Sequence, residues 1–375
     1  MKKHFILNRT LSWILLASLT LSLFTMSAFA ADTGGRIVQE KIEQSLLSIL
    51  PEPEAYGLDG VDMFSLYLGE AIAAYEVAGG ALEKLDMVIY PIFDHNDRTV
   101  LIAAVTQRGN EPVVSLSNTF TDDLCAFSPD EELAFVYDNS GVFLFDGNEL
   151  ILLEQVPECA DMGRDSIDTL GQAQLSALEG AFLSPCSRLS VPDIMSLGVL
   201  GSDDEEISLN VQIVKQSSNK TCWAAAMASM LNYGRISSQY LTENSIIKSY
   251  YGNDYDGESS PATRSLVNNV NRNYSASLQY VGNTNNARSD IWDALCGVTI
   301  RNTPYPVYGD FDGQDVSWDH AMVIRGMVGW ELFSVMDPQV GTYSTGTINR
   351  SGTEFSITLP RTGHTYVLQY YAYKY

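Results

Sequence analysis

One cysteine at the start of an alanine-rich segment is the residue of this chain best suited to nucleophilic chemistry. Residues 217–221 are polar, and Cys222 then opens a run of helix-favouring residues that stops at Gly234. A thiol in the first turn of a helix feels the positive end of the helix dipole, which favours the nucleophilic thiolate. We therefore predict that Cys222 attacks a carbonyl carbon. The alternative is a small buried cysteine that opens a core helix.

The residues around Cys222 predict the ends of this helix and a partner for the reaction. Asn219 or Thr221 is the expected N-cap, and Gly234 can take the left-handed conformation that closes a helix. Gln216 lies six residues before Cys222, on the loop that leads into the helix. Its side-chain amide can donate a hydrogen bond, beside the Cys222 backbone N–H, to the oxyanion formed in the attack.

Histidine is the natural base for a cysteine nucleophile because it titrates near neutral pH. Three of the four histidines follow residue 30, and His320 heads a strand-like run over residues 320–326. We predict that His320 faces Cys222 and acts as the base, and the alternative is a structural histidine at a strand end. His95 and His364 lie in polar or turn-like segments, so we expect both to be exposed and non-catalytic.

These segments together resemble the papain-like cysteine peptidases. Gln216, five intervening residues and then Cys222-Trp223-Ala224-Ala225 is similar to the nucleophile region of that family. Residues 319–326 resemble its D-H-A-x-x-x-x-G segment. The similarity extends over residues 209–375 and is greatest to bacterial branches, including the bacteriocin-leader-processing peptidases and related secreted enzymes. It implies a fold in which helices come first and antiparallel strands follow.

The resemblance also implies which residue orients His320. Asp337 follows a strand-like run and precedes Pro338; the leader-processing branch has aspartate and proline here, whereas papain has asparagine. The alternative is an ordinary Asp-Pro turn. Asp319, next to His320, is expected to lie in solvent. Trp223 departs from the leader-processing pattern, which usually has glycine there, so it either covers the thiolate–imidazolium pair or packs in the core.

The first thirty residues have the pattern of a secretory signal. A basic start with Lys2, Lys3 and Arg9 precedes an apolar stretch, and small residues end at Ala30, the expected cleavage point. We therefore expect a secreted protein. We expect no stable membrane insertion of the mature chain, because no later apolar run reaches the roughly 18 residues that a spanning helix needs.

Export makes disulfides chemically feasible. Five cysteines leave at least one free thiol, and Cys222 is the expected one. Cys125, Cys159, Cys186 and Cys296 allow three pairings, of which Cys159 with Cys186 is favoured because both lie in one region. Four reduced, buried cysteines are an equal alternative. The cysteine and histidine spacings match no zinc site, so we expect no metal or other cofactor.

Charge divides the chain into two parts. Residues 32–208 hold 7 Lys and Arg against 33 Asp and Glu, whereas residues 209–375 hold 12 against 13. Such asymmetry indicates two units with separate roles. The acidic part would repel phosphates, so we expect no nucleic-acid partner. The expected organisation, α+β overall, is a signal over 1–30, a small acidic α+β domain over 31–186, a connector over 187–208 and a papain-like domain over 209–375.

Local patterns predict the elements of each unit. In the acidic unit we expect helices over 36–50, 62–77 and 165–182. The antiparallel strands expected there are 87–93, 100–105, 112–116, 133–137, 142–145 and 150–153. In the second unit we expect helices over 243–249, 262–271 and 290–296. The strands expected there are 299–308, 321–326, 332–336, 343–348, 355–359 and 366–373.

The combined prediction is a secreted cysteine endopeptidase of protein or peptide substrates, made as a zymogen. Cys222 attacks, His320 takes and returns the proton, Asp337 orients His320, and Gln216 stabilises the oxyanion. The acidic unit is expected to act as an intramolecular inhibitor until the connector is cut, and a permanent binding or adhesion module is the alternative. Two other functions fit the same residues: acyl transfer to an amine, and non-catalytic peptide binding or adhesion.

Overall fold

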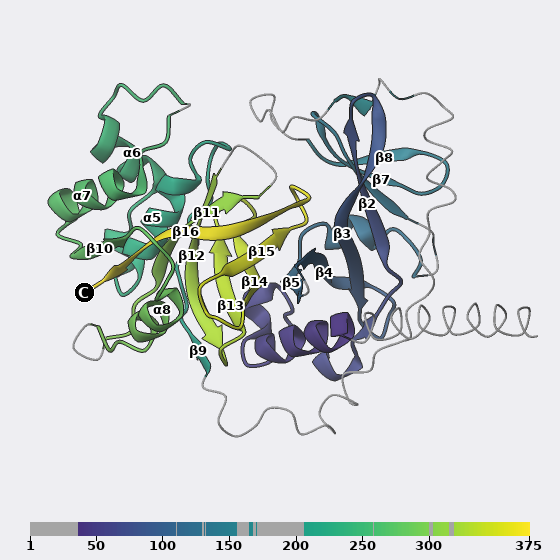
Figure 1. Ribbon diagram of the computed structural model, residues 1–375, viewed down its shortest axis with the longest axis horizontal. Coiled ribbons are helices and arrows are strands. Elements are labelled where there is room, and N and C mark those ends of the chain that lie inside the picture. Colours follow the sequence, from purple (N-terminus) through teal and green to yellow (C-terminus); the bar gives the residue numbers. More distant parts are fainter. Residues whose placement is uncertain are drawn as a thin grey trace, which may run out of the picture.

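The computed structural model describes residues 37–109, 111–129, 131, 133–155, 165–167, 170, 206–257, 259–299, 303–314 and 319–375. The signal segment, Cys159, Cys186 and most of the connector and of the predicted helix 165–182 lie outside these residues. The described chain contains both helices and sheets, in agreement with the expected α+β class (Figure 1).

The N-terminal unit combines a helix with a single sheet. The helix covers residues 37–49, as predicted, and Pro51 follows its end because proline lacks the N–H that would continue it. The sheet has the order β5-β4-β3-β2-β6-β7-β8, with β1 paired to β3, and β2 runs parallel to β6. The six predicted strands are present as β3 to β8. The elements are η1 (Pro53–Tyr56), η2 (Met63–Ser65), β1 (Tyr67–Leu68), β2 (Ile72–Ala78), β3 (Ala81–Phe93), β4 (Thr99–Arg108), β5 (Glu111–Ser117), α2 (Thr121–Leu124), β6 (Ala134–Tyr137), β7 (Gly141–Phe145) and β8 (Leu150–Gln155).

The helix predicted over residues 62–77 is wrong. Its second half is β2, which lies in the middle of the sheet between β3 and β6. Ala73, Ala74 and Val77 are buried, so both faces of this strand are covered. A strand buried on both faces lacks the alternation that identifies a strand in sequence, and pairing on both sides outweighs the helical preference of its alanines.

The C-terminal unit is built on a closed barrel. Strand β16 pairs with both β11 and β15, so the six strands from β11 to β16 form a ring. Strand β10 extends the sheet beside β16, and β9 pairs with β12. The strands are β9 (Glu206–Ser208), β10 (Leu278–Val281), β11 (Val307–Gly313), β12 (Asp319–Val328), β13 (Leu332–Asp337), β14 (Thr342–Ile348), β15 (Phe355–Leu359) and β16 (His364–Lys374).

Helices cover one side of this barrel (Figure 1). The central helix α5 (Cys222–Asn232) packs against α6, β11 and β12, and every one of its residues is buried. Gly234 follows with φ 74°, the predicted left-handed conformation. The expected strand over 299–308 is wrong for most of its described residues, because β11 begins only at Val307. The other helices are η5 (Ser237–Gln239), α6 (Glu243–Tyr251), α7 (Thr263–Tyr274) and α8 (Ala287–Leu295).

The last residues of the predicted connector belong to the second sheet. Residues 206–208 form β9 and pair with residues 326–328 of β12. Gly326 permits this approach, because a Cβ there would lie 2.6 Å from the carbonyl oxygen of Ile207. Three residues that begin with a glutamate are too short for a strand pattern, so the sequence did not indicate β9.

The barrel side away from the α-helices packs against the N-terminal unit (Figure 1). Strands β4 and β5 contact β14 and β15, and the buried apolar residues of both units form one continuous cluster.

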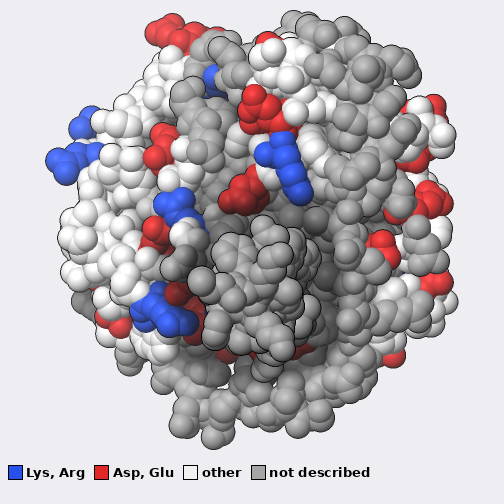
Figure 2. Space-filling view, turned by 45° about the vertical axis from the view of Figure 1, so that its right-hand side comes forward, with Lys and Arg blue, Asp and Glu red and all other residues white. Residues whose placement is uncertain are grey.

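On the face in Figure 2, acidic side chains are scattered and do not form one patch. Among the described residues, no helix has both the length and the apolar character that crossing a bilayer requires.

Candidate active site

The segment before Cys222 is held on both sides. The Gln216 backbone N–H donates to the Pro338 carbonyl at 3.0 Å, and the Ser217 N–H donates to Glu243 Oε1 at 2.9 Å. Thr221 occupies the N-cap position of α5, but its hydroxyl donates to the Ser218 carbonyl and does not cap the helix. The positive end of the helix dipole at Cys222 is therefore not offset by a side-chain cap.

His320 and Asp337 meet on neighbouring strands. His320 is the second residue of β12 and Asp337 the last of β13, and His320 Nε2 lies 2.8 Å from Asp337 Oδ1. The same oxygen accepts the Gln339 backbone N–H at 2.8 Å, so two donors hold the carboxylate. His320 is 3% exposed and Asp337 1%, which shields their interaction from water. Since Nε2 faces the carboxylate, Nδ1 is the ring nitrogen left for Cys222.

The Cys222 sulfur lies beside the His320 ring, and Cys222 keeps 9% of its surface exposed. Burial alone lowers the pKa of His320, but the Asp337 carboxylate and the Cys222 sulfur together raise this pKa to about 10. His320 is therefore a cation at neutral pH, which favours a thiolate beside it. The structure thus brings Cys222, His320 and Asp337 together as one sulfur–imidazole–carboxylate array.

Gln216 reaches the site through the turn that follows Asp337. Its backbone N–H bonds to the carbonyl of Pro338, and Pro338 directly follows Asp337, the residue whose carboxylate holds His320. Its side-chain oxygen is buried and has no hydrogen-bond partner among the described residues. A buried carbonyl oxygen without a partner costs free energy. This oxygen can only accept a hydrogen bond, so the predicted donation to an oxyanion falls to the NH₂ end of the same side chain.

Two histidines outside the array differ from each other. His95 is exposed, as predicted. The expectation that His364 is exposed is wrong: His364 begins β16, pairs with Leu359 and is only 6% exposed. The turn between β15 and β16 is covered by the N-terminal unit, where the Tyr137 hydroxyl donates to the Pro360 carbonyl at 2.6 Å. That packing comes from a distant part of the chain, so local polarity did not predict it.

The structure adds Tyr366 to the neighbourhood of the array. Its buried ring meets the His320 ring edge-on, with centroids 6.0 Å apart. The alternating, tyrosine-rich pattern of residues 366–373 predicts that one row of rings faces inward. That pattern does not indicate which residue the rings meet, because the contact depends on how the barrel closes.

Trp223 packs among tyrosines of the helical side. Its ring lies edge-on to those of Tyr250, Tyr251 and Tyr255, with centroids 6.3, 6.0 and 6.4 Å away. Trp223 is 3% exposed. Of the two alternatives for Trp223, these contacts favour core packing.

Cys222 is a free thiol, in line with the odd cysteine count, and Cys125 is free as well. Cys125 forms no disulfide with another described cysteine. The favoured pairing of Cys159 with Cys186 lies outside the described residues.

Comparisons with protein-family models and with curated protein sequences found no significant match.

Replacing Asp337 with asparagine is expected to lower the pKa of His320 from about 10 toward its ordinary value near 6.5, because the carboxylate is the main group that raises it. A raised folded-state pKa stabilises the fold fully below pH 6.5, and this contribution is lost as pH rises toward 10. Between pH 6.5 and 10, the free energy of unfolding should therefore fall less in the variant than in the unmodified protein. NMR titration of histidine rings measures the shift. The exposed Asp319→Asn is the matched control, and an unchanged His320 midpoint in Asp337→Asn would contradict the assignment.

Proposed function

We propose that this chain is a cysteine peptidase of the papain-like type. The observation that carries the proposal is the array itself: a cysteine that opens a buried helix and lies beside a histidine whose Nε2 is 2.8 Å from a buried aspartate. Helices that precede a six-strand barrel also agree with the order of elements that the motif resemblance implies.

In the proposed reaction, the Cys222 sulfur bonds to the scissile carbonyl carbon and the carbonyl oxygen becomes an oxyanion. The Cys222 N–H and the Gln216 amide donate to that oxyanion. His320 then gives its Nδ1 proton to the leaving amine as the peptide C–N bond breaks. Water, deprotonated by His320, attacks the thioester, and the carboxylate product leaves as Cys222 is restored. Asp337 keeps Nε2 as a donor throughout and stabilises the imidazolium.

A purely structural role explains the array less well. Burying a histidine–aspartate pair removes both groups from water, and such pairs add little net stability compared with apolar residues of the same volume. Within α5, Ala224 to Ala228 are fully buried, whereas Cys222 at the helix start keeps some exposure. A desolvated base and carboxylate beside a reachable thiol are the features expected of a catalytic site.

The test uses the mature protein and a mixture of peptides of known sequence in water enriched in heavy oxygen. Hydrolysis should produce new carboxyl termini that carry one heavy oxygen, read by mass spectrometry. Acyl transfer would instead join the amino-terminal fragments to an added amine without heavy oxygen. If no peptide changes and Cys222 reacts with iodoacetamide no faster than an ordinary thiol, the proposal fails. The proposal retains the secreted location expected from residues 1–30.

A further inference from the structure

The contact between the two units is apolar at its centre. Leu101 and Val105 of β4, Val114 and Leu116 of β5, and Phe333 of β13 belong to one buried cluster. The helix over residues 37–49 adds further buried residues to it: Ile42, Leu46, Leu47 and Ile49. The other face of the N-terminal sheet has a separate cluster that includes Ile89, Ile102 and Ala104. Separating the units would therefore expose a large set of apolar side chains to water.

Hydroxyl groups satisfy backbone donors across this contact. The Leu116 N–H donates to Thr345 Oγ1 at 2.9 Å, and the Thr358 N–H donates to Ser115 Oγ at 2.7 Å. Ser115, Thr345 and Thr358 are each at most 1% exposed. Strand β5 is an edge of its sheet, so its outward N–H groups need partners from outside that sheet. The barrel supplies one of them, as it would within a single folded core.

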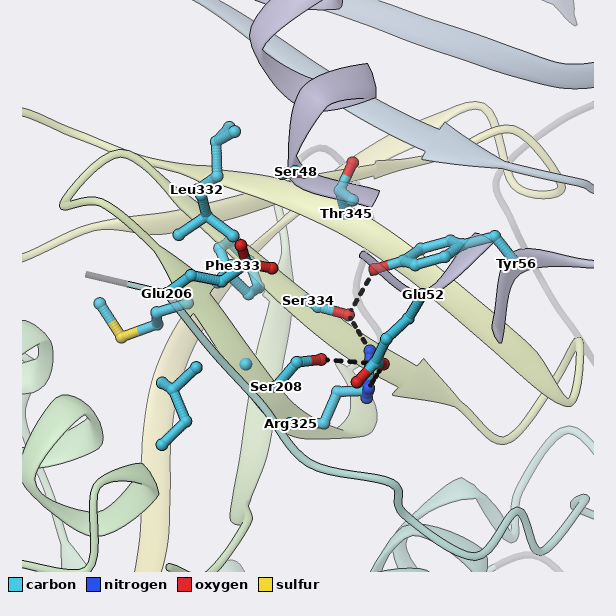
Figure 3. Close-up of a pocket in the computed structure, with 14 residues that line it drawn as sticks. Ser48, Glu52, Tyr56, Glu206, Ser208, Arg325, Leu332, Phe333, Ser334 and Thr345 are labelled. Atoms are coloured by element: carbon cyan, nitrogen blue, oxygen red, sulfur yellow. Dashed lines mark hydrogen bonds and ion pairs between the residues drawn. The ribbon is translucent and has the colours of Figure 1, made fainter. Parts of the chain in front are cut away.

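A buried arginine of the barrel takes its counter-ion from the N-terminal unit (Figure 3). Arg325 of β12 is 1% exposed and lies over the Tyr343 ring, 4.1 Å from its centroid. Its Nε donates to the Leu209 carbonyl at 2.7 Å and its Nη1 to Ser334 Oγ at 3.3 Å. Its Nη2 pairs with Glu52, the residue before η1. Without Glu52, this buried cation would lose the carboxylate with which it forms an ion pair.

The same network extends to η1 and β9. Tyr56 and Ser334 share a hydrogen bond between hydroxyls at 2.8 Å, and the Ser208 hydroxyl donates to Glu52 at 3.1 Å (Figure 3). The cavity among these residues has room for about one water molecule, about 10 Å³. The end of the connector is therefore anchored at the same place as the N-terminal segment.

Opposite charges frame the contact. Ion pairs of both polarities cross it. Three join glutamates of the N-terminal unit to arginines of the C-terminal unit: Glu52–Arg325, Glu111–Arg350 and Glu154–Arg361. Two have the opposite polarity: Lys41–Glu331 and Arg108–Glu354. Among the described residues, no hydrogen bond or ion pair that joins the units involves Cys222 or His320.

From these contacts we infer that the N-terminal unit remains bound to the barrel after the connector is cut, as a permanent non-covalent part of the protein. The partner that this barrel face fits is the chain's own residues 37–155. The position and charge of this unit led us to expect a removable inhibitor. Such an inhibitor would dissociate from the barrel once the connector is cut. The inference does not depend on the proposed peptidase activity, because it concerns association alone.

The test inserts a recognition sequence for a specific protease between residues 198 and 203 of the mature Cys222→Ala chain, which prevents self-cleavage. After cutting, the two fragments should co-elute in size-exclusion chromatography at micromolar and at nanomolar concentration. Fragments that separate on cutting would overturn the inference.

A single substitution tests the buried network. In the cut protein, Glu52→Gln should make the fragments dissociate about tenfold faster, since it removes the carboxylate beside Arg325. Glu149→Gln is the control, because Glu149 lies exposed on the same unit. Equal dissociation rates for the two variants would show that the Glu52–Arg325 pair does not help to hold the units together.

A second inference rests on the proposed function and on a different set of contacts. Arg361, in the turn between β15 and β16, donates through Nη1 to the Gln339 carbonyl at 3.0 Å. The Gln339 N–H in turn donates to Asp337 Oδ1 at 2.8 Å. Arg361 also pairs with Glu154 of β8. The geometry points to Arg361 as a positioning residue, through which the N-terminal unit holds the turn that carries Asp337.

The measured quantity is the midpoint of the His320 ring titration. If Arg361 had a merely structural role, its replacement would leave this midpoint unchanged. Arg361→Met should move its midpoint below that of the unmodified protein, because a loosened Asp337 favours the imidazolium less. Arg361→Lys should restore part of the shift. Arg350→Met is the matched control, since Arg350 also pairs across the units but is 91% exposed. Equal midpoints in Arg361→Met and Arg350→Met would overturn this inference, whether or not the protein cleaves peptides.

Discussion

Cys222→Ala is expected to abolish peptide hydrolysis, with kcat/KM reduced by roughly 10⁶-fold, the loss typical when a covalent nucleophile is removed. The sulfur forms the only bond between enzyme and acyl group in the proposed reaction, so no other group in the array replaces it. The fold should persist, because alanine extends an alanine-rich helix and favours helix more than cysteine does. Peptide turnover and thermal unfolding measured on the same sample separate the two effects.

Cys125→Ala is the matched control for this substitution. Cys125 is also a free thiol, but it lies in the N-terminal unit, where its Sγ donates to the Thr99 carbonyl at 3.3 Å. Its replacement should leave kcat/KM unchanged. Residual hydrolysis in purified Cys222→Ala at more than about a hundredth of the original rate would exclude Cys222 as the nucleophile.

His320→Ala is expected to lower kcat by about 10² to 10⁴-fold, the usual contribution of a positioned acid–base group. It should also slow alkylation of Cys222 by iodoacetamide near pH 6. The imidazolium that stabilises the thiolate is gone, and an ordinary thiol is ionised only near pH 8.5. Rates of alkylation across pH, followed by mass spectrometry of the Cys222 peptide, measure the second effect independently of turnover.

This variant also leaves Asp337 buried without its partner, which costs about 3–5 kcal/mol of folding free energy. The double variant His320→Ala with Asp337→Ala removes both charges and should recover much of that stability without recovering activity. His95→Gln, at an exposed turn, should change neither property. Rapid alkylation of Cys222 at pH 6 in the double variant would show that the thiolate is stabilised by something other than His320.

The features that the sequence determined by itself are those set by neighbours along the chain. The start of α5 at Cys222, its end before Gly234 and the strand that begins near His320 follow from capping, glycine conformation and local hydrophobic pattern. The six later strands of the N-terminal sheet were equally readable, because turn residues separate short apolar runs. Residue types also limited the choice of base, since few histidines follow residue 30.

The tertiary structure alone decided the features that depend on contacts between distant segments. Residues 72–78 are a strand because β3 and β6 cover both of its sides, and His364 is buried because the N-terminal unit packs over its turn. The distance of 2.8 Å between His320 and Asp337 depends on the pairing of β12 with β13, and the meeting of His320 with Cys222 depends on the packing of α5 against β12. Composition indicated an acidic, separate unit, whereas packing joined it to the barrel through one core. Burial and pairing energies are summed over the whole fold, so no local window of sequence contains them.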